Sequence, residues 1–120
     1  MYSKLLALGV IGAAMLVLAG SSLARPESTS VATTVVKVKA KDFLFVLSKK
    51  TVLHGRVKFV VTNPSPAVHD FAIAGKKSKL VQPGKSTTLT VVFKKKGKYP
   101  YKCTVDSHAQ LGMKGILRVT

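Results

Sequence analysis

The chain has 120 residues, a length that suits one domain and excludes two domains of ordinary size. It carries 20 Lys and Arg against 4 Asp and Glu, a formal net charge of +16, so its partners are expected to be anionic: an acidic protein, an anionic membrane surface or a nucleic acid. A single cysteine excludes an internal disulfide bond, so the thiol is either a metal ligand or a buried core residue.

The first 24 residues have the pattern of a secretory signal peptide. Lys4 precedes the continuously apolar run Leu5–Gly20, and small residues at Ser22 and Ala24 predict cleavage after Ala24. An uncleaved membrane anchor is the alternative, although the run is slightly short for a spanning helix of about 20 residues. The sequence therefore predicts export, to the periplasm or to the extracytoplasmic face of the membrane. Cleavage removes only Lys4 among the charged residues and leaves 19 basic against 4 acidic residues, a net charge of +15.

After a lead-in at residues 25–34 that is predicted to be flexible, the chain continues as a series of short strands. In the segment TVVKVKAK, Val36, Val38 and Ala40 alternate with lysines, and this period of two is typical of a half-buried strand. Residues 43–47 continue the apolar content. The other segments expected to form strands are residues 56–63, 68–75, 87–93, 99–103 and 115–120, with a short strand inside the turn region 48–55.

Turn signals separate these segments. The prolines of NPSPA, residues 63–67, end one strand because proline cannot extend a hydrogen-bonded ladder. Pro83-Gly84 and the basic segment KKKGK, residues 94–98, mark two further turns. No helical stripe of useful length follows the apolar N-terminal run. The sequence therefore predicts an all-β protein in which residues 35–120 form a two-sheet Greek-key β-sandwich.

Four residues of this domain have the chemistry of a copper site. Cys103, His108 and Met113 follow one another with the spacing C-x4-H-x4-M, and His69 lies upstream, just after the proline-rich loop. A thiolate, two imidazoles and a weak axial thioether are the ligand set of blue-copper centres. Taken singly, each residue has a simpler interpretation: a buried thiol, a loop histidine, or a methionine packed in the core.

These residues and the segments around them resemble the cupredoxins, the type 1 blue-copper family that includes plastocyanin, azurin and rusticyanin. The resemblance extends over nearly the whole mature chain, in the order DFLF, GRVKFVVTN, HDFAI, QPGKS, GKYPYKC and GMKGILRV. It implies a single type 1 copper ion, with His69, Cys103 and His108 as equatorial ligands and Met113 as the axial ligand. Cys103 would bind as the thiolate because the metal displaces its proton. The implied function is that of an exported one-electron carrier.

The chain departs from the family pattern next to the first histidine. Many members have Asn at the position of Asp70, where it ties the two ligand loops together. We expect the Asp70 carboxylate to accept hydrogen bonds from Thr104 or from the backbone near Cys103, and Asn63 to support the same loops. The loop also lacks the proline that several relatives place before the second histidine. Its spacing is closer to rusticyanin-like and sulfocyanin-like loops, and the subfamily stays open.

The resemblance also implies a contact surface for redox partners. His108 would reach the surface through an apolar patch, and the residues expected to contact a partner are Pro66, Ala67, Ala109 and Leu111. The lysine runs at residues 49–50, 76–79 and 94–98 predict fast, salt-sensitive association with an acidic redox protein or an anionic membrane surface. We expect the protein to act as a monomer, with no small-molecule substrate.

Two other functions compete with the carrier. A copper chaperone or scavenger would use exposed, exchangeable soft ligands, often several methionines, whereas the mature chain has one methionine. A metal-free sandwich could bind an anionic surface through its lysines; nucleic acid is disfavoured because the chain has an export signal and only eight aromatic residues. Enzymatic activity is not expected. His54, the third histidine, is predicted to lie at the surface, so no catalytic three-histidine copper site can form.

Overall fold

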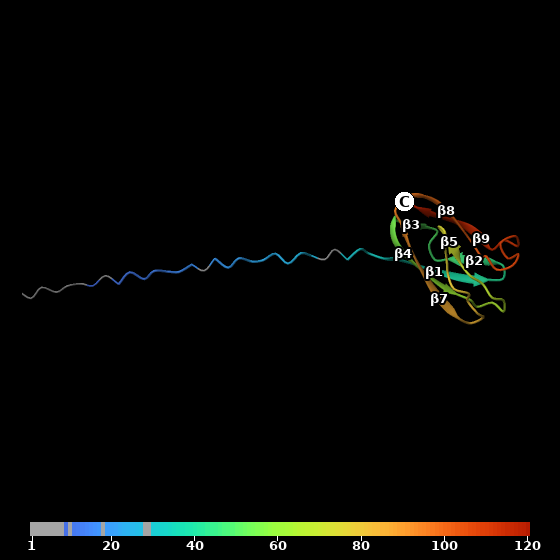
Figure 1. The fold of residues 1–120 in the computed structure, drawn as a ribbon, viewed down its shortest axis with the longest axis horizontal. Coiled ribbons are helices and arrows are strands. Elements are labelled where there is room, and N and C mark those ends of the chain that lie inside the picture. Colours follow the sequence, from blue (N-terminus) through green and yellow to red (C-terminus); the bar gives the residue numbers. More distant parts are fainter. Residues whose placement is uncertain (1–8, 10, 18, 28–29) are drawn as a thin grey trace, which may run out of the picture.

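The computed structural model describes residues 9, 11–17, 19–27 and 30–120. Residues 1–8, 10 and 18 of the predicted signal peptide, and residues 28–29 of the predicted lead-in, lie outside the described residues. The described residues before Thr34 belong to no strand or helix, and all regular structure from there to Val119 is β (Figure 1). The described part of the chain therefore offers no helix as a membrane span.

The first sheet has four strands. In spatial order they are β2 (Leu44–Leu47), β1 (Thr34–Lys41), β4 (Gly55–Thr62) and β7 (Ser86–Phe93). β1 pairs with β4 in parallel, and the other two pairings are antiparallel. β1 and β4 are therefore the two inner strands of this layer.

The second sheet has five strands. In spatial order they are β3 (Thr51–Val52), β9 (Lys114–Val119), β8 (Gly97–Lys102), β5 (Ala72–Ile73) and β6 (Lys76–Lys77). β3 pairs with β9 in parallel, and β9, β8, β5 and β6 follow in antiparallel pairs. The chain crosses between the two sheets repeatedly, and the predicted two-sheet Greek-key sandwich is confirmed.

Alternation of apolar and basic side chains determines which face of each strand is buried. In β1, Val36, Val38 and Ala40 are fully buried, while the lysines between them are exposed. In β4, Val57 and Phe59 point into the same core in the same way. Each Val or Phe buried in this manner contributes roughly 1.5–3 kcal/mol to folding. The inner faces of the two sheets together form one continuous core.

One predicted strand is much shorter than expected. Residues 68–75 were predicted to be strand-like, but only Ala72–Ile73 form β5, and His69 makes an isolated bridge to Val81. The physical reason is that Phe71, between them, pairs outside any ladder: its N–H donates to Ser78 Oγ at 3.0 Å and its carbonyl accepts from the Ser78 N–H at 2.9 Å. The segment is thus held by local bonds that leave His69 free to face the end of the sandwich.

Gly115 is required where β9 passes Tyr101. A Cβ atom at this position would lie 2.3 Å from Tyr101 Oη and 2.5 Å from Cζ. Tyr101 is buried against Phe71, so its ring has little room to move away. We expect Gly115→Ala to lower the free energy of unfolding by about 1–3 kcal/mol, measured by urea denaturation.

Two variants control this prediction. Ile116→Ala changes the neighbouring exposed position and should alter stability by less than about 0.5 kcal/mol. In a Tyr101→Ala background, the added methyl group at residue 115 should lose most of its cost, because the clashing ring is gone. An equal cost of Gly115→Ala in both backgrounds would contradict the steric explanation.

Candidate metal centre

Two loops meet at one end of the sandwich. Residues 63–70 follow β4 and carry His69, and residues 103–113 connect β8 to β9 and carry Cys103 and His108. His69 is fully buried and Cys103 is 1% exposed. Side chains 34 and 39 positions apart in sequence are thereby brought into contact.

A set of tight backbone bonds closes the 103–113 loop. The N–H of His108 donates to the Val105 carbonyl at 3.1 Å, and the N–H of Met113 donates to the His108 carbonyl at 3.1 Å. The N–H of Cys103 donates to the Met113 carbonyl at 3.0 Å. The C-x4-H-x4-M spacing therefore places the backbones of all three predicted ligands side by side.

Asn63 supports the other loop through its side-chain hydrogen bonds. Its side-chain N–H groups donate to the carbonyls of Ala67 and Val81, both at 2.7 Å. Its Oδ1 accepts from the Ser65 N–H at 2.9 Å and from the Ser65 hydroxyl at 2.6 Å. Asn63 is 1% exposed, and both donors and both acceptor positions of its side chain are used within the protein. These bonds shape the loop that carries His69.

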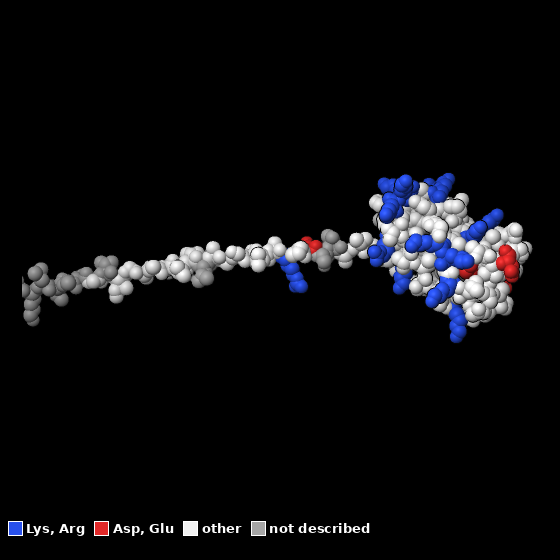
Figure 2. All heavy atoms as spheres, viewed as in Figure 1, with Lys and Arg blue, Asp and Glu red and all other residues white. Residues whose placement is uncertain are grey.

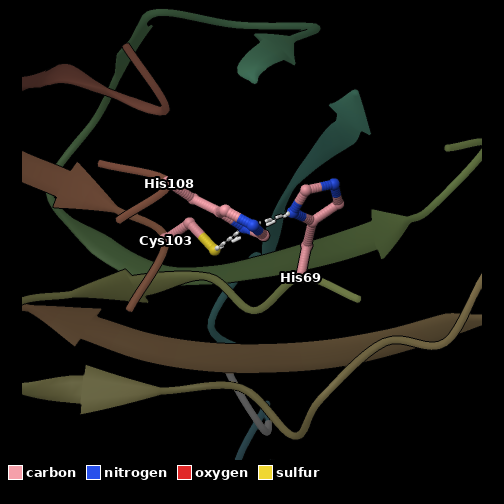
Figure 3. Close-up of side chains that lie close together, drawn as sticks. All are labelled: His69, Cys103 and His108. Atoms are coloured by element: carbon pink, nitrogen blue, oxygen red, sulfur yellow. Dashed lines mark hydrogen bonds between the residues drawn. The ribbon is translucent and has the colours of Figure 1, made fainter. Parts of the chain in front are cut away.

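The donor atoms of His69, Cys103 and His108 converge (Figure 3). His69 Nδ1 lies 3.2 Å from His108 Nδ1, and Cys103 Sγ lies 3.9 Å and 3.7 Å from these two nitrogens. Metal bonds of about 2.0 Å to nitrogen and 2.3 Å to sulfur give donor separations of roughly 3–4 Å around one ion. The cluster therefore fits a type 1 copper site, whose equatorial donors are two imidazoles and one thiolate.

The outer nitrogen of His69 is held by two side chains that the sequence analysis missed. His69 Nε2 lies 2.9 Å from Asp42 Oδ1 and 2.9 Å from Ser65 Oγ. A carboxylate only accepts hydrogen bonds, so Nε2 carries the proton and the lone pair of Nδ1 is free to face the metal. The one available signal was that Asp42 is among only four acidic residues in a strongly basic chain.

Asp70 joins the two loops in the way that the sequence suggested. The Thr104 N–H donates to Asp70 Oδ1 at 2.6 Å, and the Thr104 hydroxyl donates to Oδ2. Asp70 is 1% exposed, so both bonds are shielded from water. Because Asp70 follows His69 and Thr104 follows Cys103, these bonds fix the distance between the two ligand positions.

Burial raises the pKa of the Cys103 thiol above its ordinary value, and the charge of Asp70 acts in the same direction. Hydrogen bonds from the backbone of Asp70 and Val105 oppose this effect by stabilising the anion. The metal-free thiol is therefore protonated at neutral pH. A bound cation would supply the stabilisation that the thiolate lacks, which is the usual behaviour of metal-binding cysteines.

Met113 is fully buried, and its backbone contacts both Cys103 and His108. These backbone bonds place residue 113 next to two of the three converging donors. Core packing explains the burial of Met113, because its side chain belongs to the main hydrophobic cluster. The axial role of Met113 stays a prediction.

An apolar surface surrounds the metal end. Pro66 and Leu111 are exposed, and Ala67 and Ala109 are partly exposed, as expected of a contact patch. The structure adds Phe43, whose ring centroid lies 4.9 Å from that of the half-buried His108 and which is 36% exposed. Partner contact by the four predicted residues is untested and stays a prediction.

The charges of the domain are separated in space. Asp42, Asp70 and Asp106 all lie at the metal end, and neither residues 63–70 nor residues 103–113 contain a lysine or arginine. Figure 2 shows acidic atoms at this end of the domain and basic atoms over the rest of the visible surface. Neither ligand loop therefore contributes a basic side chain to the metal end.

A two-sheet sandwich with a buried histidine, a buried cysteine and a second histidine converging at one end defines a mononuclear copper-site domain. A family model for the cupredoxin-like domain matches residues 9–117, and the chain belongs to that family. A sequence search of curated proteins gave no match.

Solved structures of auracyanins share the fold. Auracyanin B superposes with a TM-score of 0.64 at 19% identity, over 76% of this chain and 91% of its own. A dithionite-reduced auracyanin from the photosynthetic bacterium Roseiflexus castenholzii gives 0.61 at 22% identity, over 75% and 98%. Auracyanin A, described as a "blue" copper protein of the green thermophilic photosynthetic bacterium Chloroflexus aurantiacus, gives 0.62 at 18% identity, over 74% and 100%.

Proposed function

We propose that this protein is an exported type 1 blue-copper protein that carries single electrons between redox partners. The observation that carries the proposal is the convergence of His69 Nδ1, His108 Nδ1 and Cys103 Sγ within 3.2–3.9 Å of one another. The chain's membership of the cupredoxin-like family and the "blue" copper description of auracyanin A support the same assignment.

The surrounding residues favour electron transfer over metal exchange. Copper bound here would supply a Cu(I)/Cu(II) couple with a thiolate ligand. The protein's contribution is rigidity, because Asp42 and Ser65 hold the His69 ring, and Asp70 ties its loop to that of Cys103. A site that moves little between oxidation states needs little reorganisation. Of the three converging ligands, only the half-buried His108 offers an edge to a partner.

The direct test is an optical and electron spin resonance spectrum of the purified mature protein with one equivalent of Cu(II). If the protein is a carrier, we expect an intense visible thiolate-to-copper absorption and a spin resonance signal with a narrow copper hyperfine splitting. Reduction should reversibly remove both the absorption and the signal. A protein that binds only Cu(I), with no stable coloured form, would instead support a copper chaperone or scavenger. The buried positions of His69 and Cys103 favour the carrier over that alternative.

The third histidine, His54, lies away from the proposed copper site. His54 is exposed, and its Nδ1 lies 3.1 Å from the Thr120 carbonyl, at the end of β9 remote from the Lys114 end that adjoins the metal loop. It is therefore unavailable for a three-histidine copper site, which supports a non-enzymatic role without a small-molecule substrate. Export rests on the signal-peptide pattern of residues 1–24.

Replacing Asp42 with asparagine should raise the reduction potential. The negative carboxylate beside His69 would stabilise the more positive oxidised metal, and Asp42→Asn removes this charge while keeping an oxygen that can accept the hydrogen bond from Nε2–H. A unit charge across one imidazole ring, with the carboxylate 30% exposed, is worth on the order of 1–2 kcal/mol, or roughly 40–90 mV for a one-electron couple. Potentiometric titration of the visible band measures the shift.

Asp106→Asn is the matched control, because it removes from the 103–113 loop an exposed acidic group that forms no side-chain hydrogen bond with His69 or His108. Its shift should be less than half that of Asp42→Asn, since exposed charges are screened. Equal shifts in the two variants would show that the Asp42–His69 contact has no special influence on the metal.

A further inference from the structure

The outer face of the second sheet carries a groove that the metal centre does not use. It lies between the β5–β6 hairpin and the exposed faces of β8 and β9, and its volume is about 860 Å³. Its lining is mainly apolar, through residues such as Ala72, Pro100 and Ile116, and none of the residues that line it is acidic. A smaller hollow of about 300 Å³ adjoins it and shares Ile116.

The strand register gives this face a charge pattern. Along the β8–β9 ladder, Lys98 lies opposite Arg118 and Lys102 lies opposite Lys114. Between these two basic pairs, Pro100 lies opposite Ile116, and Ile116 is 57% exposed. Along the strands, this face therefore presents a basic pair, then an apolar pair, then a second basic pair.

Such a pattern is costly without a partner. Like charges directly opposite each other on adjacent strands destabilise a sheet, and here two such pairs occur on one face. On β6, Lys77 lies opposite Ala72, which in turn lies opposite Lys102, so a third lysine joins the same row. An anionic group placed on this row would relieve the repulsion.

We propose that this face binds an extended acidic segment of the protein's redox partner, with the sequence pattern acid-x-apolar-x-acid. Alternate side chains of an extended chain point to one side, so positions i, i+2 and i+4 of the segment match the spacing of the Lys98–Arg118, Pro100–Ile116 and Lys102–Lys114 pairs. The apolar residue would enter the groove beside Ile116, and each of the two acids would lie on one basic pair, Lys98–Arg118 or Lys102–Lys114.

A segment is favoured over a flat anionic membrane because the apolar part of the face is a groove, which a bilayer surface cannot fill. The groove begins beside the metal centre, since Lys102 precedes Cys103, and Lys114 follows Met113. A docked partner is thus held next to the ligand loop. That the partner is a redox protein rests on the proposed function, whereas binding of the acidic segment does not.

The test is a titration of the isotope-labelled protein, metal-free and Cu(I)-loaded, with a synthetic peptide SETLTES, followed by amide chemical shifts. Shift changes should cluster on β8, β9 and the β5–β6 hairpin. A peptide of the same composition without the spacing, STEELTS, should bind at least about fivefold more weakly. Ile116→Ser should weaken binding by roughly tenfold, and Lys98→Ser/Arg118→Ser by about three- to tenfold.

Val92→Ser and Lys37→Ser/Lys58→Ser are matched controls on the outer face of the first sheet, and they should leave binding unchanged. The proposal is overturned if shifts spread equally over both sheets, or if the two peptides bind alike. It is also overturned if the peptide fails to bind while phosphatidylglycerol vesicles bind with the same dependence on Ile116. Peptide binding to a protein that takes up no copper would refute the carrier function alone.

Discussion

Cys103→Ser is expected to abolish the intense visible absorption of the copper-loaded protein. The absorption requires a thiolate bond, and a serine hydroxyl stays protonated and binds copper weakly. Because loss of a group that merely orients a ligand costs about 10–100-fold in metal affinity, loss of a direct ligand should cost at least about 100-fold. A competition titration against a chelator of known affinity measures this loss.

The fold should survive the change, since serine has nearly the shape of cysteine. Far-ultraviolet circular dichroism of metal-free Cys103→Ser should match that of the parent protein. His54→Ala is the matched control for loss of a potential ligand, because His54 lies away from the converging donors and should keep the full spectrum. A visible band that persisted in Cys103→Ser would disprove the ligand assignment and with it the proposed function.

Phe71→Ala is expected to destabilise the protein by about 3–5 kcal/mol. Phe71 is fully buried, and its ring centroid lies 5.2 Å from Phe45, 5.1 Å from Phe59 and 5.4 Å from Tyr101. It therefore packs strands of both sheets together, two residues after His69. A total stability of about 5–15 kcal/mol is usual for a domain, so this loss is a large fraction of it. Urea denaturation of the metal-free protein gives the value.

Phe93→Ala separates loss of packing from damage to the site. Phe93 is 2% exposed and packs against Tyr99, but it lies opposite Gly55, at the end of β7 remote from the ligand loops. Both variants should lose similar stability, whereas only Phe71→Ala should also lower copper affinity and broaden the spin resonance spectrum. Equal copper affinity in the two variants would show that Phe71 does not position His69.

Much of the site was visible in the sequence because its signals are local. The C-x4-H-x4-M spacing identified Cys103 and His108, and the loop that follows β4 identified His69. The hydrogen bonds between Asp70 and Thr104 were also foreseen, because each residue directly follows a ligand. In these cases the predicted ligand and the residue that helps to position it are neighbours along the chain.

Other contributions came from segments with no sequence relation to the ligands. Asp42 bonds to His69 across 27 positions, and Phe43 packs against His108 from the same turn between β1 and β2. Ser65 was hidden because a serine in a proline-rich loop has many ordinary roles. The strand predicted at residues 68–75 was too long, since apolar alternation does not reveal that Phe71 pairs with Ser78 instead of a ladder.

The sequence by itself determined the β-sandwich, its buried faces and the ligand types, because a period of two and a short ligand spacing depend only on neighbouring residues. Tertiary structure alone decided that Asp42 holds the His69 ring and that β8 and β9 align two basic pairs around Ile116. These features depend on strand register and loop packing. Both arise from contacts between distant segments, whose free energies no local pattern encodes.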